Sequence, residues 1–273
     1  MTDVLDLVPP GDRLARPDLA ELALEGLVRA DAYRATRAMH CRVAVADVLS
    51  DDDVRIDQLL HGEIFDVLDR STGRGEGRVS GRVSGRVWGR ARRDGVVGWV
   101  VRDSLSDGAP LATHQVAGVD AALPLNALVM HDHDGLAADD LRPIGSFEND
   151  LAAVAERLLG RPHAPGARSS ISTDCSGLVQ QALLACGLPG PRRSDVQATL
   201  GRPVSPAERR RGDIVVWRAP GGDHDWTGHS ALMADDRRII HATGGKGVVI
   251  EDFDAVQARL VAEGFEPAIL RRL

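Results

Sequence analysis

The spacing of apolar residues changes near residue 147, and this change limits the chain to at least two differently built parts. Between residues 41 and 106, short alternating segments such as EIFDVLDR (63–70) are separated by turn residues at close intervals. After residue 147, two stretches with helical spacing come first and strand-like segments follow. The first pattern is typical of a small all-β barrel and the second of an α+β domain. A chain of 273 residues is long enough to hold both.

Turn-forming and helix-breaking residues refine the boundaries of these parts. Residues 18–35 carry apolar side chains at positions 19, 22, 23, 27 and 28, which predicts a short amphipathic helix after Pro17. We therefore predict four segments: an N-terminal helical segment (1–40), a small all-β domain (41–106), a shortened fragment or linker (107–146) and an α+β domain (147–273).

The last segment allows a more detailed prediction. Gly160 and Gly187 end two helical stretches, and Gly/Asp-rich turns separate the later strands. The predicted helices cover 148–160, 175–186 and 194–201, and the predicted strands cover 213–219, 229–235, 237–243 and 247–253.

Charge and hydropathy exclude several classes of protein. The net charge of −7 argues against a nucleic-acid partner. No run approaches 18 apolar residues, so no membrane span is expected. The first 20 residues lack a basic start and an apolar core, so no signal peptide is predicted. The default location is then cytoplasmic, with the periplasm or the outside of the cell left open, and the sequence leaves no trace of an oligomeric state.

Two polar stretches have ordinary and functional interpretations. The repeat GRVSGRVSGRVWGR (77–90) fits an extended ribbon whose basic face could hold an anionic polymer, but a solvated loop is the favoured interpretation. The run HDHD (131–134) resembles a metal site in isolation, yet no further ligands follow at useful spacing, so a solvated turn is favoured.

The stretch STDCSGLVQQALLACG (172–187) places Cys175 at the start of an apolar helix. Thr173 or Asp174 can cap that helix, and unpaired N–H groups at a helix start lower a thiol pKa. The position therefore predicts a nucleophilic thiolate, with a small buried side chain as the alternative. Cys41 and Cys186 lack such a setting and are expected in the core.

A cysteine nucleophile needs a base, which must come from elsewhere in the fold. GHSALMADDRRIIHAT (228–243) has a hairpin pattern with a turn near Asp235, so His229 and His241 are expected almost opposite one another, within a residue of register. One imidazole can then face the thiol while the other orients it. Two unrelated strand-end histidines, or a Cys/His/His zinc site, are the alternatives left open.

Five blocks in order resemble the NlpC/P60 family of papain-like cysteine peptidases, which cut bacterial cell-wall peptides. The blocks are TDCSGLVQQAL, PRRSDVQ, RRGDIVVW, GHSALM and RIIHAT. The segments EIFDVLDR and WGRARRDGVVGWV are similar to a bacterial SH3 domain. The resemblance implies an α+β, papain-like catalytic domain preceded by a small all-β SH3-like barrel.

The resemblance also implies roles for single residues. Cys175 would be the nucleophile, His229 the general base and His241 the orienting residue. Asp174 and Ser176 lie where relatives often hold the free amine of a stem peptide, and His163 stands where a tyrosine is expected, which puts the substrate choice in doubt. No metal or cofactor is implied.

Three functions follow. The leading one is a cysteine endopeptidase that hydrolyses peptidoglycan stem peptides or muropeptides at the γ-D-glutamyl–diamino acid bond through a thioester acyl-enzyme. A papain-like amidase or acyltransferase would share the acyl-enzyme and change the acceptor. A catalytically weak wall- or polymer-binding SH3 protein is the third.

Overall fold

The computed structural model describes residues 13–69, 85–219 and 228–273. The chain forms two compact units. One contains the described residues up to Ala112 together with 127–130, and the other contains residues 113–126 and the described residues from His131 onward. The segment 107–146, predicted as a fragment or linker, is thus divided between the two units.

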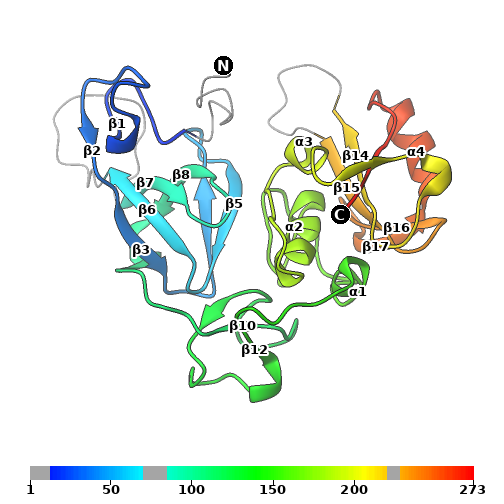
Figure 1. Ribbon diagram of the computed structural model, residues 1–273, viewed down its shortest axis with the longest axis horizontal. Coiled ribbons are helices and arrows are strands. Elements are labelled where there is room, and N and C mark those ends of the chain that lie inside the picture. Colours follow the sequence, from blue (N-terminus) through cyan, green and yellow to red (C-terminus); the bar gives the residue numbers. More distant parts are fainter. Residues whose placement is uncertain (1–12, 70–84, 220–227) are drawn as a thin grey trace. The chain divides into compact units, whose positions relative to one another are not determined.

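The first unit is built around one antiparallel sheet of seven strands, ordered β5-β4-β8-β7-β6-β3-β9. It curls around a core that includes Met39, Phe65 and Val100 (Figure 1). Cys41 is fully buried in this core, as predicted. The strands of the unit are β1 (Ala20–Glu21), β2 (Tyr33–Arg34), β3 (Arg37–Cys41), β4 (Val45–Leu49), β5 (Arg55–Leu60), β6 (Ile64–Asp69), β7 (Arg86–Ala91), β8 (Val97–Val101), β9 (Leu105–Asp107) and β11 (Leu128–Val129).

The helix predicted over residues 18–35 is wrong. Only Leu22–Leu24 form a single 3-10 turn, and Gly26 follows with φ of 78°. Leu22 and Leu27 are half exposed. Leu14 and Leu19 pack instead with Trp88 and other residues of the barrel. Tertiary packing outweighs the local helical pattern here.

Most of the Arg-Gly-Val repeat lies outside the described residues. Its last part forms β7, in which Val87 and Trp88 are both buried. Arg86 pairs with Asp53, and Arg90 lies 3.0 Å from Glu21. The arginines of the described part of the repeat therefore have acidic partners within the unit.

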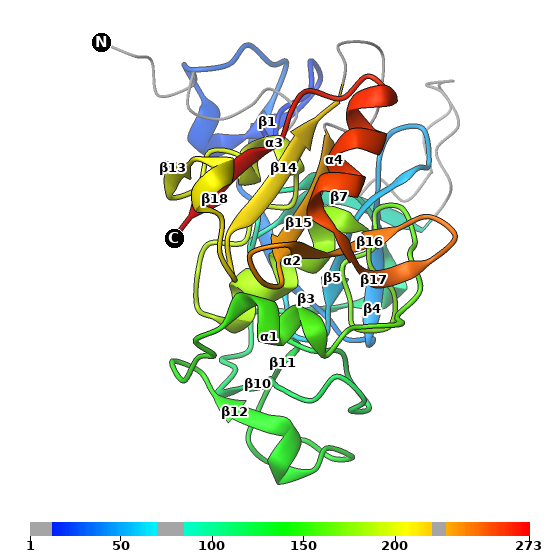
Figure 2. The ribbon, with the colours of Figure 1, turned by 90° about the vertical axis from the view of Figure 1, so that its right-hand side faces the viewer.

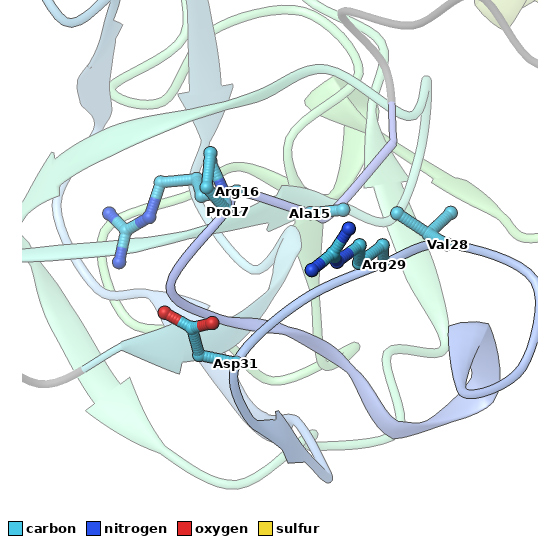
Figure 3. Close-up of a pocket in the computed structure, with 6 residues that line it drawn as sticks. All are labelled: Ala15, Arg16, Pro17, Val28, Arg29 and Asp31. Carbon is cyan, nitrogen blue, oxygen red and sulfur yellow. The ribbon is translucent and has the colours of Figure 1, made fainter.

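An open hollow of about 400 Å³ lies in the first unit (Figure 3). The guanidinium of Arg16, one of its lining residues, lies 4.1 Å from the ring centre of Trp88 and 2.7 Å from Asp69. The lining residues are Ala15, Arg16, Pro17, Val28, Arg29 and Asp31. None of the predicted catalytic residues belongs to this hollow.

The second unit has a six-stranded sheet ordered β13-β18-β14-β15-β16-β17, in which every neighbouring pair is antiparallel. Its elements are β10 (His114–Val116), β12 (Leu141–Pro143), α1 (Leu151–Glu156), α2 (Cys175–Ala185), α3 (Ser194–Gln197), β13 (Arg202–Val204), β14 (Ile214–Arg218), β15 (Gly228–Met233), β16 (Arg238–Thr243), β17 (Gly247–Asp252), α4 (Phe253–Ala262) and β18 (Ile269–Arg272). The predicted α+β order of helices before strands is confirmed.

Both faces of this sheet are covered by helices. Ile214 and Val216 of β14 pack in the cluster that contains α1 and α2. Val215 and Trp217 point to the other face and pack against α4. Figures 1 and 2 show α4 on the side of the sheet away from α2. A strand buried on both faces has a continuous apolar run instead of alternation, which explains the segment IVVW.

The helices predicted in this unit are present but shorter. Helix α1 covers only six residues of the predicted 148–160, and α3 only four of 194–201. The four predicted strands are β14 to β17. Helix α4 and strand β18 were not predicted, although Asp252 caps α4 by accepting from the N–H of Ala255 at 2.9 Å.

Candidate active site

Cys175 is the first residue of α2, and Asp174 is the cap. One carboxylate oxygen of Asp174 accepts from the N–H of Gly177 at 2.7 Å, and the other accepts from the N–H of Gly166 at 2.9 Å. A Cβ on Gly177 would collide with the carbonyl oxygen of Ala167, so glycine allows the first turn of α2 to lie against the preceding loop. The predicted start of α2 is therefore fixed by the Asp174 cap and by the close packing of Gly177 against Ala167.

A buried ion pair ties this helix start to the segment before α3. The guanidinium of Arg192 lies 2.5 Å and 3.1 Å from the two carboxylate oxygens of Asp174, and it donates to the hydroxyl of Ser176 at 2.8 Å. Only 5% of the Arg192 side chain and 15% of the Asp174 side chain are exposed. Asp174 and Ser176, predicted to bind substrate, thus have partners within the unit.

The thiol of Cys175 lies against β15, where the backbone N–H of Ser230 donates to it. Burial and the neighbouring charge of Asp174 raise the thiol pKa to about 11, and the hydrogen bonds from Ser230 and Ser176 offset only part of this rise. The expectation that the helix start lowers this pKa is wrong for the resting structure. Removing the sulfur from water outweighs the two hydrogen bonds and the charge of Arg192 that favour the thiolate.

The two predicted histidines meet. The Nε2 atom of His229 on β15 lies 2.7 Å from Nδ1 of His241 on β16, and the two rings meet edge to face. The ladder pairs Leu232 with Ile240 and Met233 with Ile239. Continued, this register puts His241 opposite Ala231, so the histidines are offset by two residues and not by one. Side chains two residues apart share a face of a strand, and diagonal neighbours remain within reach.

Both imidazoles are held neutral. Burial lowers the pKa of His229 to about 3, and electrostatic interactions with His241, Arg259 and His163 lower it further, against a smaller opposing effect of Asp174. His241 is fully buried, and burial lowers its pKa as well, although the bond to Glu251 opposes this. A neutral imidazole has one bare nitrogen, which is what a proton acceptor requires.

Glu251, on β17, was not predicted. Its Oε2 atom lies 2.8 Å from Nε2 of His241, and its Oε1 atom accepts from Lys246 at 2.8 Å. Arg259 of α4 lies 3.4 Å from each oxygen. A signal was present in the sequence, because a hairpin turn near residue 245 puts Glu251 opposite Ile239, diagonal to His241.

His163 lies in the loop before α2, where it forms a parallel bridge with Thr173. It is partly exposed, and it is one of the groups whose electrostatic interaction lowers the pKa of His229. Its predicted part in substrate binding stays a prediction.

Two other features concern ligands and membranes. Within residues 13–69, 85–219 and 228–273, no group of three or more His, Cys, Asp and Glu side chains is arranged to hold a metal ion. The HDHD run forms a largely exposed turn. None of the helices in the described part of the chain has the length and apolar content needed to cross a membrane.

A measurement of thiol reactivity tests the electrostatics of this site. We expect the rate of Cys175 alkylation by iodoacetamide to rise about tenfold per pH unit from pH 7 to about pH 10, because a thiol whose pKa is about 11 is protonated throughout that range. Subtracting the rate of a Cys175→Ser protein removes the contributions of Cys41 and Cys186. A plateau below pH 8.5 would contradict the raised pKa.

Known proteins resemble both units. The NlpC/P60 family matches residues 160–262, and the bacterial dipeptidyl-peptidase SH3 domain matches residues 50–105. The peptidoglycan endopeptidase RipB of Mycobacterium tuberculosis (strain CDC 1551 / Oshkosh) is 36% identical over 81 residues, which are 30% of this chain and 32% of that protein. The γ-DL-glutamyl hydrolase of Bacillus subtilis (strain 168) is 29% identical over 104 residues, which are 38% of this chain and 25% of that protein. The chain thus covers a third or less of these two relatives.

A solved structure extends the comparison to the fold. The crystal structure of an NlpC/P60 family protein from Bacillus cereus ATCC 10987 covers 86% of this chain and 99% of its own, with a TM-score of 0.68 and 15% identity. At that identity the likeness concerns the fold alone. The two family matches show that the chain carries an NlpC/P60 domain over residues 160–262 and, ahead of it, a bacterial SH3 domain over residues 50–105.

Proposed function

We propose that the protein is a cysteine endopeptidase that hydrolyses peptidoglycan stem peptides. The observation that carries this proposal is the arrangement at one end of α2. There the Cys175 thiol accepts an N–H from the residue that follows His229, and His229 is hydrogen-bonded to His241. The relative named peptidoglycan endopeptidase supports the substrate class, and the one named γ-DL-glutamyl hydrolase is consistent with cleavage at a γ-glutamyl bond, for which we propose the γ-D-glutamyl–diamino acid bond.

In the proposed reaction Cys175 is the nucleophile and His229 the general base. The thiol proton moves to His229 as the sulfur attacks the scissile carbonyl carbon, forming a C–S bond and placing an electron pair on the carbonyl oxygen. When that pair returns, the C–N bond breaks, and the leaving amine takes the proton from His229. A thioester remains.

Deacylation repeats these steps with water. His229 takes a proton from the water molecule as its oxygen attacks the thioester carbonyl. The C–S bond then breaks, and the sulfur recovers the proton from His229. Burial raises the pKa of the Cys175 thiol and lowers that of His229, which favours a proton transfer that accompanies the attack over an ion pair formed beforehand.

The charge that develops on the carbonyl oxygen needs donors. The first N–H groups of a helix have no partner within the helix, so the backbone N–H of Cys175 can serve as one such donor. Asp174, Ser176 and His163 remain the proposed contacts for the stem peptide. The carboxylate of Asp174 would have to serve a substrate amine while it also binds Arg192.

Defined peptides test the proposal. We expect L-Ala–γ-D-Glu–diaminopimelate–D-Ala to give L-Ala–D-Glu and diaminopimelate–D-Ala, as identified by mass spectrometry. The matched control peptide has an α-linked L-Glu and should stay intact. An intact γ-linked peptide, or one cut only at another bond, would contradict the proposal. Transfer of the acyl group to an added amine in preference to water would indicate an acyltransferase instead.

A further inference from the structure

Glu251 completes a chain of hydrogen bonds that begins at His229. The chain runs from Nε2 of His229 to Nδ1 of His241 over 2.7 Å, and from Nε2 of His241 to Oε2 of Glu251 over 2.8 Å. His241 thus uses a different nitrogen for each of these two neighbours. The direction of every bond in such a chain depends on which end can only accept.

The Glu251 end can only accept, because its carboxylate is ionised. Lys246 donates to Oε1, and the guanidinium of Arg259 lies beside both oxygens. These bonds and that of His241 hold the carboxyl pKa at about 2, against the opposing effect of desolvation. Around neutral pH an ionised carboxylate offers no proton.

The protons of the two histidines follow from this. An accepting Oε2 requires a proton on Nε2 of His241, and a neutral His241 then has a bare Nδ1. That bare Nδ1 accepts, so His229 must donate from its Nε2. A neutral His229 with a proton on Nε2 has a bare Nδ1.

We propose that Glu251 is a positioning residue that acts through His241 to select the His229 tautomer with a bare Nδ1. The proposal rests on the proposed function only in assigning the Cys175 proton to that Nδ1. Its distribution of protons stands on the hydrogen-bond chain alone. Glu251 does not touch the thiol, and its effect passes through the fully buried ring of His241.

The charge of Glu251 matters more than its size in this proposal. A glutamine has the same shape but can either accept with its oxygen or donate with its NH₂ group. Donation to Nε2 of His241 would reverse every bond of the chain and put the proton on Nδ1 of His229. A purely structural role for Glu251 would survive the change to glutamine.

Long-range ¹H–¹⁵N NMR of the histidine rings reads these tautomers directly. In the wild-type protein at pH 7 we expect His241 and His229 each to be protonated at Nε2 only. In Glu251→Gln we expect each of the two rings to populate both tautomers. In Glu251→Leu we expect His241 to lose its preference for a proton on Nε2. The variants His229→Gln and His241→Gln assign the signals.

Glu156→Gln is the matched control, because Glu156 also binds an arginine, Arg211, at 2.7 Å and is not part of the hydrogen-bond chain of the histidines. It should leave the histidine spectrum unchanged. A proton on Nδ1 of His229 in the wild-type protein would overturn the proposal. So would a wild-type spectrum in Glu251→Gln. If Glu251→Leu does not fold, the spectra of the wild-type protein and of Glu251→Gln still test whether Glu251 selects the tautomer of His229.

Kinetics give a second measurement. We expect kcat of Glu251→Leu to fall by about 10- to 100-fold, as for other residues that orient a catalytic group, while KM changes little. Glu251→Gln should lie between this variant and the wild type. A kcat equal to that of the wild type in both variants would overturn the positioning role. A wild-type protein without hydrolase activity would overturn the proposed function, whereas the NMR result would still decide the tautomer.

Discussion

The Cys175→Ala protein is expected to fold normally and to cleave no stem peptide at a measurable rate. Removal of a nucleophile typically lowers kcat by roughly four orders of magnitude or more, because the acyl-enzyme no longer forms. The fold should survive, since the thiol contributes one hydrogen bond with Ser230 and the cap of the helix belongs to Asp174. Product formation followed by chromatography, with thermal unfolding measured in parallel, checks both expectations.

The control for this variant is Cys186→Ala, which removes the partly exposed thiol just past the other end of the same helix. It should retain the wild-type rate. His229→Gln should resemble Cys175→Ala, because the thiol then has no base. Cleavage by Cys175→Ala at the wild-type rate would eliminate the proposed mechanism.

Replacing Arg192 by Leu is expected to lower the free energy of unfolding by about 3–5 kcal/mol, the usual cost of breaking a buried ion pair from one side. The change leaves the carboxylate of Asp174 desolvated without its cation and removes the donor to Ser176. Urea denaturation measures the loss of unfolding free energy. A double-mutant cycle with Asp174→Asn isolates the interaction energy of the Asp174–Arg192 pair.

Arg193→Leu provides the comparison, because the next residue pairs with Asp195 at 3.2 Å through side chains that are both 37% exposed. An exposed pair of this kind contributes about 0–1 kcal/mol. Equal losses in the two variants would show that the Asp174–Arg192 pair does not hold the helix start.

A shared helix start links these two predictions. Asp174 caps α2 beside the nucleophile, and its negative charge also raises the pKa of the Cys175 thiol. Arg192 partly offsets that effect. We therefore expect the Arg192 variant to hydrolyse stem peptide more slowly at neutral pH, in addition to its lower stability.

Local pattern was sufficient for the elements that carry the candidate site. The apolar run after Cys175 predicted α2 and placed the cysteine at its first residue. The hairpin pattern around residue 235 predicted that His229 and His241 would meet. Both predictions succeeded because periodicity and turn residues report the local backbone, and a hairpin brings together residues that are close in sequence.

The same reasoning failed where contacts between segments distant in sequence determine the local structure. Residues 18–35 have helical spacing, but they form only a 3-10 turn, two short strands and loops, while Leu14 and Leu19 pack with Trp88 and other residues of the barrel. The pairing of Asp174 with Arg192 joins segments that no periodicity connects. Glu251 was missed because its role depends on the register of two successive hairpins, each offset by two residues from a direct pairing.

The sequence by itself determined which residues stand at the start of α2 and on the hairpin, and that a small β domain precedes an α+β domain. Only the tertiary structure decided their chemical state. Burial raises the pKa of the Cys175 thiol and lowers that of His229, and Glu251 lies 2.8 Å from the ring of His241. Desolvation and charge depend on every group packed around an atom, and that surrounding exists only in the folded chain.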